Sequence, residues 1–517
     1  METVQHTGVI ISSKQITLTE LVAVARGYAT VHLSDEVKSG IIRSREAVER
    51  MLAEKRVVYG ITTGFGSFAD LVIDPEQTKE LQQNLIESHA CGVGKPLPED
   101  VVRAMILLRV KSLSRGYSGI RLVTIETLIA MLNKKVTPIV PEKGSLGSSG
   151  DLCPLSHMAL PILGKGEALF RGEHLSGEAA MARAGIKTIE LEAKEGLALN
   201  NGTQCMTAIG ALAVYDSLHL LEYAEMAAGL TLEALNGRMD AFDPRIHELR
   251  EQEGQRESAK KMRTILEGST FVYNEERSKV IRVQDAYAIR CIAQVHGASR
   301  DAINFVLGIV LREMNAVTDN PLIFYEGNDV EAISGGNFHG QPMALPMDFL
   351  CIALAEIANI SERRLERMLN DDLSNGLPSY LTERGGLNSG FMIVQYSAAA
   401  LVSENKVLAH PASVDSIPSS NNQEDHVSMG TIAARKCAEI LANTQQVIAM
   451  EMLTAAQAID LRKKLYGDAA HGQTSKMLYN AIREKVPYME RDRVIAPDIK
   501  DIAGLIKNEV LTKGAIL

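Results

Sequence analysis

The residues with the clearest chemical potential lie in the segment Ser145-Leu-Gly-Ser-Ser-Gly-Asp151. The Gly150 nitrogen carries no side chain to crowd it, so it can attack the carbonyl carbon of Ser148 and close a five-membered ring. Loss of water from Ser149 would then leave an exocyclic methylidene, which is an electrophile made without an added cofactor. The alternative is an exposed turn that leads into a helix with Asp151 as its N-cap, and the tripeptide alone favours that turn.

Six further segments of uncommon composition follow one order along the chain. They are Tyr59-Gly-Ile-Thr-Thr-Gly-Phe-Gly66, Asn84-Leu-Ile-Glu-Ser-His89, Asn201-Gly-Thr-Gln204, Arg282-Val-Gln-Asp-Ala-Tyr287, Ser334-Gly-Gly-Asn-Phe-His339 and Asn422-Gln-Glu-Asp-His426. Together with Gly144 to Met158, these segments resemble the aromatic amino acid ammonia-lyases, and within them most closely the branch that acts on histidine. The resemblance spans nearly the whole chain.

This resemblance implies that Ser148-Ser149-Gly150 forms a 4-methylideneimidazol-5-one (MIO) group and that no external cofactor is required. The family usually has Ala where Ser148 stands, but this residue contributes only its backbone to the ring, so we expect the substitution to be tolerated. By resemblance, Asn337 and Phe338 form the pocket wall next to the electrophile.

The resemblance also assigns the remaining steps of an ammonia elimination. Such a reaction needs an electron sink and a base near the β-carbon. The base would be Tyr59, whose phenol starts near pKa ~10 and must be acidified by cations or helix ends to act at neutral pH. Asn201 and Gln284 would bind the electrophile and the substrate carboxylate. Tyr287 and Arg290 are three residues apart on one helical face, so Arg290 can hold a carboxylate through its two-pronged guanidinium while Tyr287 hydrogen-bonds nearby.

Substrate choice is predicted to rest on Ser88-His89 and on Gln423-Glu424. Similar enzymes that act on phenylalanine or tyrosine carry Phe-Leu or His-Leu at the first pair and lack the Glu at the second. Burying an unpaired imidazole nitrogen costs roughly 1–3 kcal/mol, and His89 and Glu424 can pair with both nitrogens. The expected reaction is therefore elimination of ammonia from L-histidine to give trans-urocanate. Whether Glu424 shares the role of base with Tyr59 stays open.

Two alternatives remain at this point. One is an ammonia-lyase or 2,3-aminomutase of the same family that acts on tyrosine or phenylalanine. The other is a noncatalytic helical scaffold in which the tripeptide never cyclises.

Composition predicts the fold class. Hydrophobic residues make up 46% of the 517 residues, whereas aromatic residues reach only 4% and Trp is absent, which favours helices packing on helices. The resemblance implies a mainly α fold, a long-helix bundle of the fumarase/ammonia-lyase type with a loop-rich N-terminal active-site domain. Because the chain exceeds the size of one hydrophobic core, we predict an N-terminal MIO-bearing domain at 1–225 and a central helical bundle with C-terminal helices at 226–517.

Charge and cysteine usage restrict the partners. A net charge of −10 gives no basic surface for nucleic acid or an anionic membrane. The chain begins without a signal-peptide pattern and has no run of about 18 apolar residues, so we expect a cytoplasmic enzyme acting on a small amino acid. The six cysteines are scattered and never form Cys-x-x-Cys, which indicates reduced thiols. The resemblance implies a homotetramer in which neighbouring subunits complete each pocket.

Local patterns predict several elements. An apolar helical face runs from Leu350 to Met368, and its opposite face, with charges from Glu362 to Arg367, is predicted to be solvated or intersubunit. A buried central helix is expected at about Thr203 to Asn236. The best strand candidates are Val57-Val58-Tyr59 and Leu322 to Tyr325.

Two motifs are set aside. Gly467 to Thr474 imitates a phosphate-binding loop but has Gln473 where that motif requires Lys. Glu424-Asp425-His426 offers metal-binding side chain types, yet adjacent residues point in different directions and no second His pair has ligand spacing, so no metal is expected.

Overall fold

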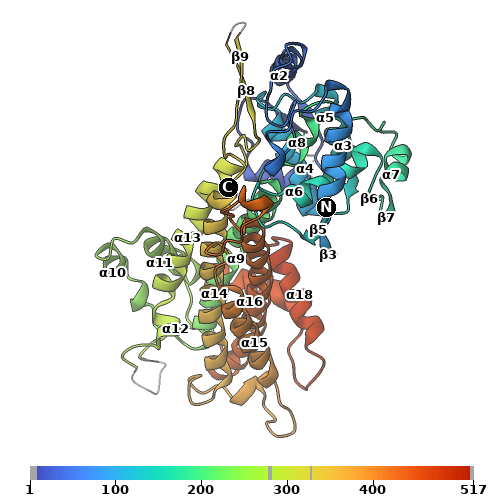
Figure 1. Cartoon of the computed structure of the whole chain (residues 1–517). Coiled ribbons are helices and arrows are strands. Elements are labelled where there is room, and N and C mark those ends of the chain that lie inside the picture. Colours follow the sequence, from blue (N-terminus) through green and yellow to red (C-terminus); the bar gives the residue numbers. More distant parts are fainter. Residues whose placement is uncertain (1–7, 277–281, 327–328, 513–517) are drawn as a thin grey trace. The chain divides into compact units, whose positions relative to one another are not determined.

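A computed structural model of the chain describes residues 8–276, 282–326 and 329–512. Long helices dominate these residues, and the strands are short (Figure 1). The predicted mainly α fold class is confirmed.

The chain forms two compact units that alternate along the sequence. The first comprises Met1–Leu212, Leu307–Asp348 and Pro411–Arg435, and the second comprises Ala213–Val306, Phe349–His410 and Lys436–Leu517. The predicted division of the chain into domains 1–225 and 226–517 stays a prediction, and the two units divide the chain differently.

The first unit combines short helices with small sheets. Its helices are α1 (Leu18–Ala25), α2 (Asp35–Ala53), α3 (Thr78–His89), α4 (Glu99–Leu113), α5 (Leu122–Lys134), α6 (Leu152–Ala159), α7 (Gly177–Arg183) and α8 (Glu195–Asn200). Its strands are β1 (Val9–Ile11), β2 (Val31–Leu33), β3 (Val93–Pro96), β4 (Val136–Pro138), β5 (Pro141–Lys143), β6 (Glu167–Phe170), β7 (Glu173–Ser176), β8 (Leu322–Glu326) and β9 (Asp329–Ile333). In the described residues β1 pairs with β2 in parallel, whereas β3–β5, β4–β6–β7 and β8–β9 are antiparallel. The strand predicted around Leu322 is therefore confirmed.

The second unit is built from helices. Those that lie wholly within it are α10 (Pro244–Glu248), α11 (Glu253–Ile265), α12 (Tyr287–Arg290), α15 (Met392–Leu408), α17 (Gln473–Lys485) and α18 (Ala496–Lys507). Four longer helices have residues in both units, namely α9 (Gln204–Ala234), α13 (Ile292–Glu313), α14 (Gln341–Leu369) and α16 (Gly430–Tyr466).

Helix α9 matches the buried central helix predicted at Thr203 to Asn236. Its residues are apolar on all sides, and almost every one of them is buried. Among the described residues, α14 alone is long and apolar enough to cross a membrane, but 67% of its most apolar window is buried inside the fold. That degree of burial is typical of a core helix.

The charged face predicted between Glu362 and Arg367 is only partly solvated, so this prediction was wrong in part. Arg363 is exposed, but Glu362 and Arg364 are buried. The Arg364 guanidinium donates to both carboxylate oxygens of Glu451 on α16, at 2.6 and 2.8 Å. A two-pronged ion pair of this kind compensates for the desolvation of both charges.

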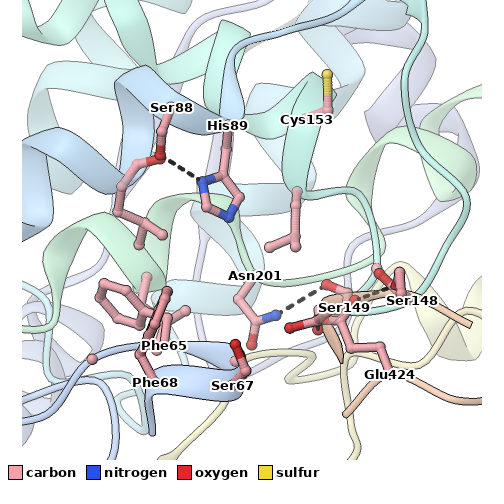
Figure 2. A pocket seen from close by; sticks show the side chains of 18 of the residues that line it. Phe65, Ser67, Phe68, Ser88, His89, Ser148, Ser149, Cys153, Asn201 and Glu424 are labelled. Carbon is pink, nitrogen blue, oxygen red and sulfur yellow. Dashed lines mark hydrogen bonds between the residues drawn. The ribbon is translucent and has the colours of Figure 1, made fainter. Parts of the chain in front are cut away.

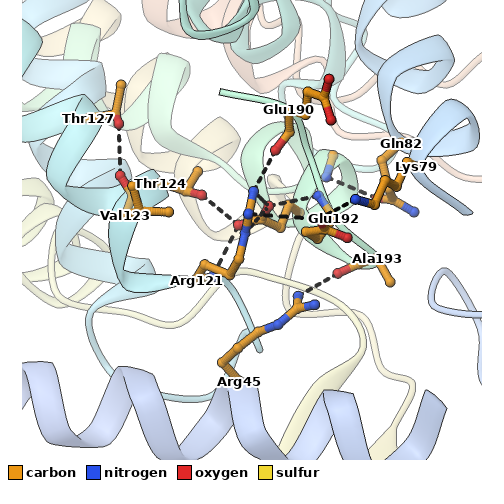
Figure 3. Close-up of polar contacts among 12 residues, drawn as sticks. Arg45, Lys79, Gln82, Arg121, Val123, Thr124, Thr127, Glu190, Glu192 and Ala193 are labelled. Carbon is orange, nitrogen blue, oxygen red and sulfur yellow. Dashed lines mark hydrogen bonds and ion pairs between the residues drawn. The ribbon is translucent and has the colours of Figure 1, made fainter. Parts of the chain in front are cut away.

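A buried carboxylate, that of Glu195, holds the short helix α8 that leads toward the functional segments. Figure 3 shows Arg121 and Glu192, which both donate to it. Glu195, the first residue of α8, accepts hydrogen bonds from the Arg121 guanidinium at 2.8 Å and from the Glu192 amide at 2.8 Å. A negative charge at this end also interacts favourably with the helix dipole. Asn201 directly follows the last residue of α8, so the hydrogen bonds that hold α8 also help to position Asn201.

Candidate active site

The first unit contains a cavity of about 810 Å³ (Figure 2). Residues of the loop 59–73, helix α3, the segment 144–153 and the loop 419–424 line the cavity. Seven of the predicted site residues line it, namely Tyr59, His89, Ser148, Ser149, Gly150, Asn201 and Glu424. The structure thus brings together motifs that are more than 350 residues apart in sequence.

The backbone at Gly150 accepts no side chain. Its φ is +74°, and a Cβ built there would lie 2.2 Å from the Gly202 carbonyl oxygen. That carbonyl in turn accepts the Asp151 amide at 2.7 Å. Glycine is therefore required both by conformation and by close approach, and this leaves the Gly150 nitrogen uncrowded, as ring closure would need.

Two polar groups hold Ser149. The Asn201 side-chain amide donates to the Ser149 carbonyl oxygen at 3.0 Å, and the Ser149 hydroxyl donates to Glu424 Oε1 at 3.0 Å. Figure 2 shows both contacts at the floor of the cavity. A hydrogen bond to the carbonyl fixes the tripeptide. Dehydration would remove the Ser149 α-proton and expel the hydroxyl as water, and Glu424 is in contact with that leaving hydroxyl. The residues present therefore fit an MIO group.

Asp151 does not cap α6 in the manner of the alternative interpretation. It occupies the N-cap position, but its side chain makes no capping bond. Instead the buried carboxylate accepts the Met206 amide at 2.9 Å and the hydroxyls of Thr431 and of Ser145, the latter at 3.1 Å. Burial raises the Asp151 pKa to about 6, and the hydrogen bonds oppose that rise. The segment is thus a tightly held turn whose residues are half-buried or buried, and it is not an exposed turn.

Tyr59 does not lie in a strand, so the strand predicted at Val57-Val58-Tyr59 was wrong. The residues form a turn in which Thr62 accepts the Val58 amide at 2.9 Å, and Ile61 is fully buried in the core next to α2. Side-chain capping by threonine and burial of Ile61 override the strand preference of two valines.

The Tyr59 hydroxyl lies in the cavity and accepts the Gly66 amide at 3.3 Å. Burial raises the Tyr59 pKa, the Gly66 hydrogen bond lowers it, and the negative charge of Glu424 raises it further. The net direction is upward, which is opposite to the acidification that the sequence argument requires. The described residues of this chain do not supply that acidification.

His89 is the last residue of α3, and its ring points into the cavity (Figure 2). Its Nδ1 lies 3.1 Å from the Ser88 hydroxyl. Burial lowers the His89 pKa, so the imidazole is neutral at neutral pH and can either donate or accept. Across the cavity, Glu424 Oε2 accepts the Ser419 hydroxyl at 3.1 Å.

Some predicted site residues do not line this cavity. Asn337 and Gln423 are exposed and Phe338 is half-buried, although the Phe338 carbonyl lies 2.9 Å from the point where a Gly150 Cβ would stand. The other three, Gln284, Tyr287 and Arg290, belong to the second unit.

Those three residues form a cluster of their own. Arg290 donates to the Gln284 side chain, and its guanidinium lies over the Tyr287 ring at 4.8 Å from the centroid. Tyr287 and Arg290 therefore lie next to each other, as predicted. Their roles in substrate binding stay predictions.

Sequence reasoning missed most of the apolar wall. Phe65, Phe68 and Leu71 line the cavity from the loop after Tyr59, and Cys91 and Cys153 line it near His89. Phe65 lies inside a motif noted in the sequence, but no spacing signal marks Phe68 or Leu71 as wall residues. In the described residues, no group of three His, Cys, Asp or Glu side chains could hold a metal ion.

Comparison with known proteins places this geometry in a family. Residues 16–484 match the aromatic amino acid lyase family. The histidine ammonia-lyase of Alkaliphilus oremlandii is 58% identical over 498 residues, which cover 96% of each chain. The crystal structure of histidine ammonia-lyase from Trypanosoma cruzi superposes with a TM-score of 0.90 at 41% sequence identity. The match covers 98% of this chain and 94% of that protein.

The tyrosine aminomutase of Streptomyces globisporus is also similar in structure, at 38% identity and a TM-score of 0.92, with 98% of each chain covered. These matches define a carbon–nitrogen lyase fold. The chain belongs to the aromatic amino acid lyase family.

Proposed function

We propose that this chain eliminates ammonia from L-histidine and releases trans-urocanate, using an MIO group formed from Ser148-Ser149-Gly150. The observation that carries the proposal is the arrangement around Ser149, where Asn201 donates to the carbonyl and Glu424 accepts from the hydroxyl, next to Gly150, a position at which no side chain fits. The identity of 58% with a protein named histidine ammonia-lyase supports the choice of substrate.

The proposed mechanism assigns one task to each side chain. The MIO group supplies an electrophile for the substrate amine. Tyr59 takes the β-proton, because its hydroxyl faces the cavity, where it accepts the Gly66 backbone amide. His89 and Glu424 pair with the two imidazole nitrogens of the substrate. Asn201 keeps the tripeptide carbonyl fixed.

The remaining predicted residues are assigned to the substrate carboxylate and to the surroundings of the electrophile. Arg290 provides the positive charge for the carboxylate, with Gln284 and Tyr287 as hydrogen-bonding groups. Asn337 and Phe338 are assigned to the pocket wall next to the electrophile, and Gln423 is assigned to substrate choice together with Glu424. We expect the enzyme to work in the cytoplasm, which agrees with six cysteines that are all free.

We further propose a homotetramer in which neighbouring subunits complete each pocket. Large apolar side chains are exposed on the long helices, including Leu345 at 54%, Ile352 at 51% and Tyr396 at 59%. A monomer that exposes such side chains along its helices has surface suited to association. Light scattering on the purified chain tests this directly, and a monomer would contradict it.

The central experiment is ultraviolet monitoring of the purified chain with L-histidine, because urocanate absorbs where histidine does not. Product analysis with histidine, tyrosine and phenylalanine separates the proposal from its relatives. A main product that is a β-amino acid would indicate an aminomutase. An unmodified intact mass together with no turnover would indicate a noncatalytic scaffold.

Changing Tyr59 to Phe is expected to slow elimination by about 10²–10⁴-fold, because loss of a general base has this effect. The phenyl ring keeps the edge contact with Phe65, whose centroid lies 6.5 Å away, so the cavity should keep its shape. Steady-state kinetics and intact mass measure the two effects separately. A near-normal rate would show that Tyr59 is not the base and would make Glu424 the next candidate for that role.

The pH profile follows from the direction of the Tyr59 pKa shift. The base is active when deprotonated, and its pKa is raised above the ordinary value. The deprotonated fraction is therefore small at neutral pH and grows as pH rises. We expect kcat/KM to increase by about tenfold per pH unit between about pH 7 and pH 9. A plateau that begins at neutral pH would show that the assembled enzyme acidifies Tyr59.

A further inference from the structure

Two cysteines meet beside the cavity. Cys91 is exposed two residues after His89, and Cys153 is buried in the first turn of α6, two residues after Asp151. Both line the cavity. Neither has a task in the proposed elimination.

Their contact is close. The Cys153 sulfur lies against the backbone of Gly92, the residue that follows Cys91, since a Cβ built on Gly92 would be 3.2 Å from this sulfur. The neighbouring Cys91 backbone and thiol both affect the pKa of the Cys153 thiol, so the two residues are close enough to interact. A disulfide needs α-carbons within about 4.4–6.8 Å, and the Cys153 sulfur already lies against Gly92, the residue bonded to Cys91.

We propose that Cys91 and Cys153 are a reversible thiol–disulfide pair that links the redox state of the surroundings to substrate binding at His89. The oxidant is a low-molecular-weight disulfide such as oxidised glutathione. Exposed Cys91, as the thiolate, attacks one sulfur of that disulfide and releases one thiol. Cys153, as the thiolate, then attacks the Cys91 sulfur of the mixed disulfide and releases the second thiol. Two protein thiols are oxidised and one disulfide is reduced to two thiols.

The geometry sets the order and the pH dependence of these steps. Cys91 reacts first because it is exposed. Burial raises the Cys153 pKa to about 11, so its thiolate fraction increases with pH throughout the neutral range. The closing step should therefore accelerate in mildly alkaline buffer.

The link would act on the substrate through His89. The Cys91 amide donates to the His89 carbonyl at 3.0 Å, and the Gly92 amide donates to His157 on α6 at 3.0 Å. Drawing the Cys91 side chain onto α6 therefore shifts the backbone that carries His89. We expect the oxidised enzyme to show a several-fold higher KM for L-histidine. This consequence rests on the proposed function, whereas the link itself does not.

The test treats the purified full chain with oxidised glutathione and then counts thiols, maps peptides without reduction and measures KM. The expected result is the loss of two thiols, a cross-linked pair of peptides containing Cys91 and Cys153, a raised KM, and recovery on reduction. Each variant is compared with its own reduced form. Cys91→Ser and Cys153→Ser should lose both the link and the change in KM, whereas the matched control Cys291→Ser, which alters a half-buried cysteine of the second unit, should keep both.

Three results would overturn the proposal. They are retention of all six thiols, a mixed disulfide that stays on Cys91, and a link that forms while KM stays constant. If the chain does not turn over histidine at all, the thiol count and the peptide map still decide whether the pair exists. The failure of the proposed function and the failure of the thiol pair are therefore distinguishable.

Discussion

Replacing Ser149 with Ala is expected to abolish nearly all turnover while the helix content stays unchanged. Ring closure and Ser149 dehydration each expel one water, so the unaltered chain should weigh less than its translated sequence by two water molecules. Without the Ser149 hydroxyl the second loss cannot occur, and no methylidene forms. Intact mass, circular dichroism and the urocanate assay measure the three effects.

Ser148→Ala is the matched control, because it removes the neighbouring hydroxyl and leaves the ring atoms unchanged. This variant should keep the full mass loss and most of the turnover. Active protein with an unmodified mass would end the MIO proposal, and so would activity that survives in Ser149→Ala.

The second large effect concerns substrate choice. A phenyl ring offers no hydrogen-bonding group to the free ring nitrogen of His89 or to the Glu424 carboxylate, and sites built on hydrogen bonds reject such analogues by about 10⁴-fold. We expect a strong preference for L-histidine over L-phenylalanine in kcat/KM. The double variant His89→Phe with Glu424→Gln should lose that preference. The cavity of about 810 Å³ is large enough that shape alone does not enforce the choice.

The two single variants give each residue's share of the discrimination, and intact mass confirms that the electrophile has formed in every variant. If the unaltered chain handled tyrosine or phenylalanine as well as histidine, the roles of His89 and Glu424 would be wrong. The electrophile itself would remain supported.

Sequence predicted those parts of the fold that depend on local pattern. Helix α9 is apolar on all sides, and residues Leu322 to Tyr325 form a short run of apolar and aromatic side chains. Each pattern predicts the element that forms there. The charges near Arg364 were misjudged because the partner, Glu451, is 87 residues away and leaves no local signal. The strand expected at Val57 failed because threonine hydroxyl bonding made a turn more favourable.

The site was predictable where a residue has a chemical task. Ser149 and Glu424 were predicted from their chemistry together with the family resemblance, and Asn201 from the resemblance alone. The three residues meet in one cavity. Wall residues such as Phe68 have no task beyond filling space, so only the folded loop identifies them. The electrostatics of Tyr59 also escaped prediction, since the direction of its pKa shift depends on burial and on the distant charge of Glu424.

The hydrogen bond between Ser149 and Glu424 has a consequence for the order in which the site would be completed. Glu424 Oε1 is occupied by the Ser149 hydroxyl, while Oε2 accepts the Ser419 hydroxyl. Dehydration would delete the Ser149 hydroxyl and leave Oε1 without its donor, which opens a place for an imidazole N–H. Maturation would thus create the electrophile and vacate the recognition group in the same event, so unmatured chains would neither react with substrate nor compete for it.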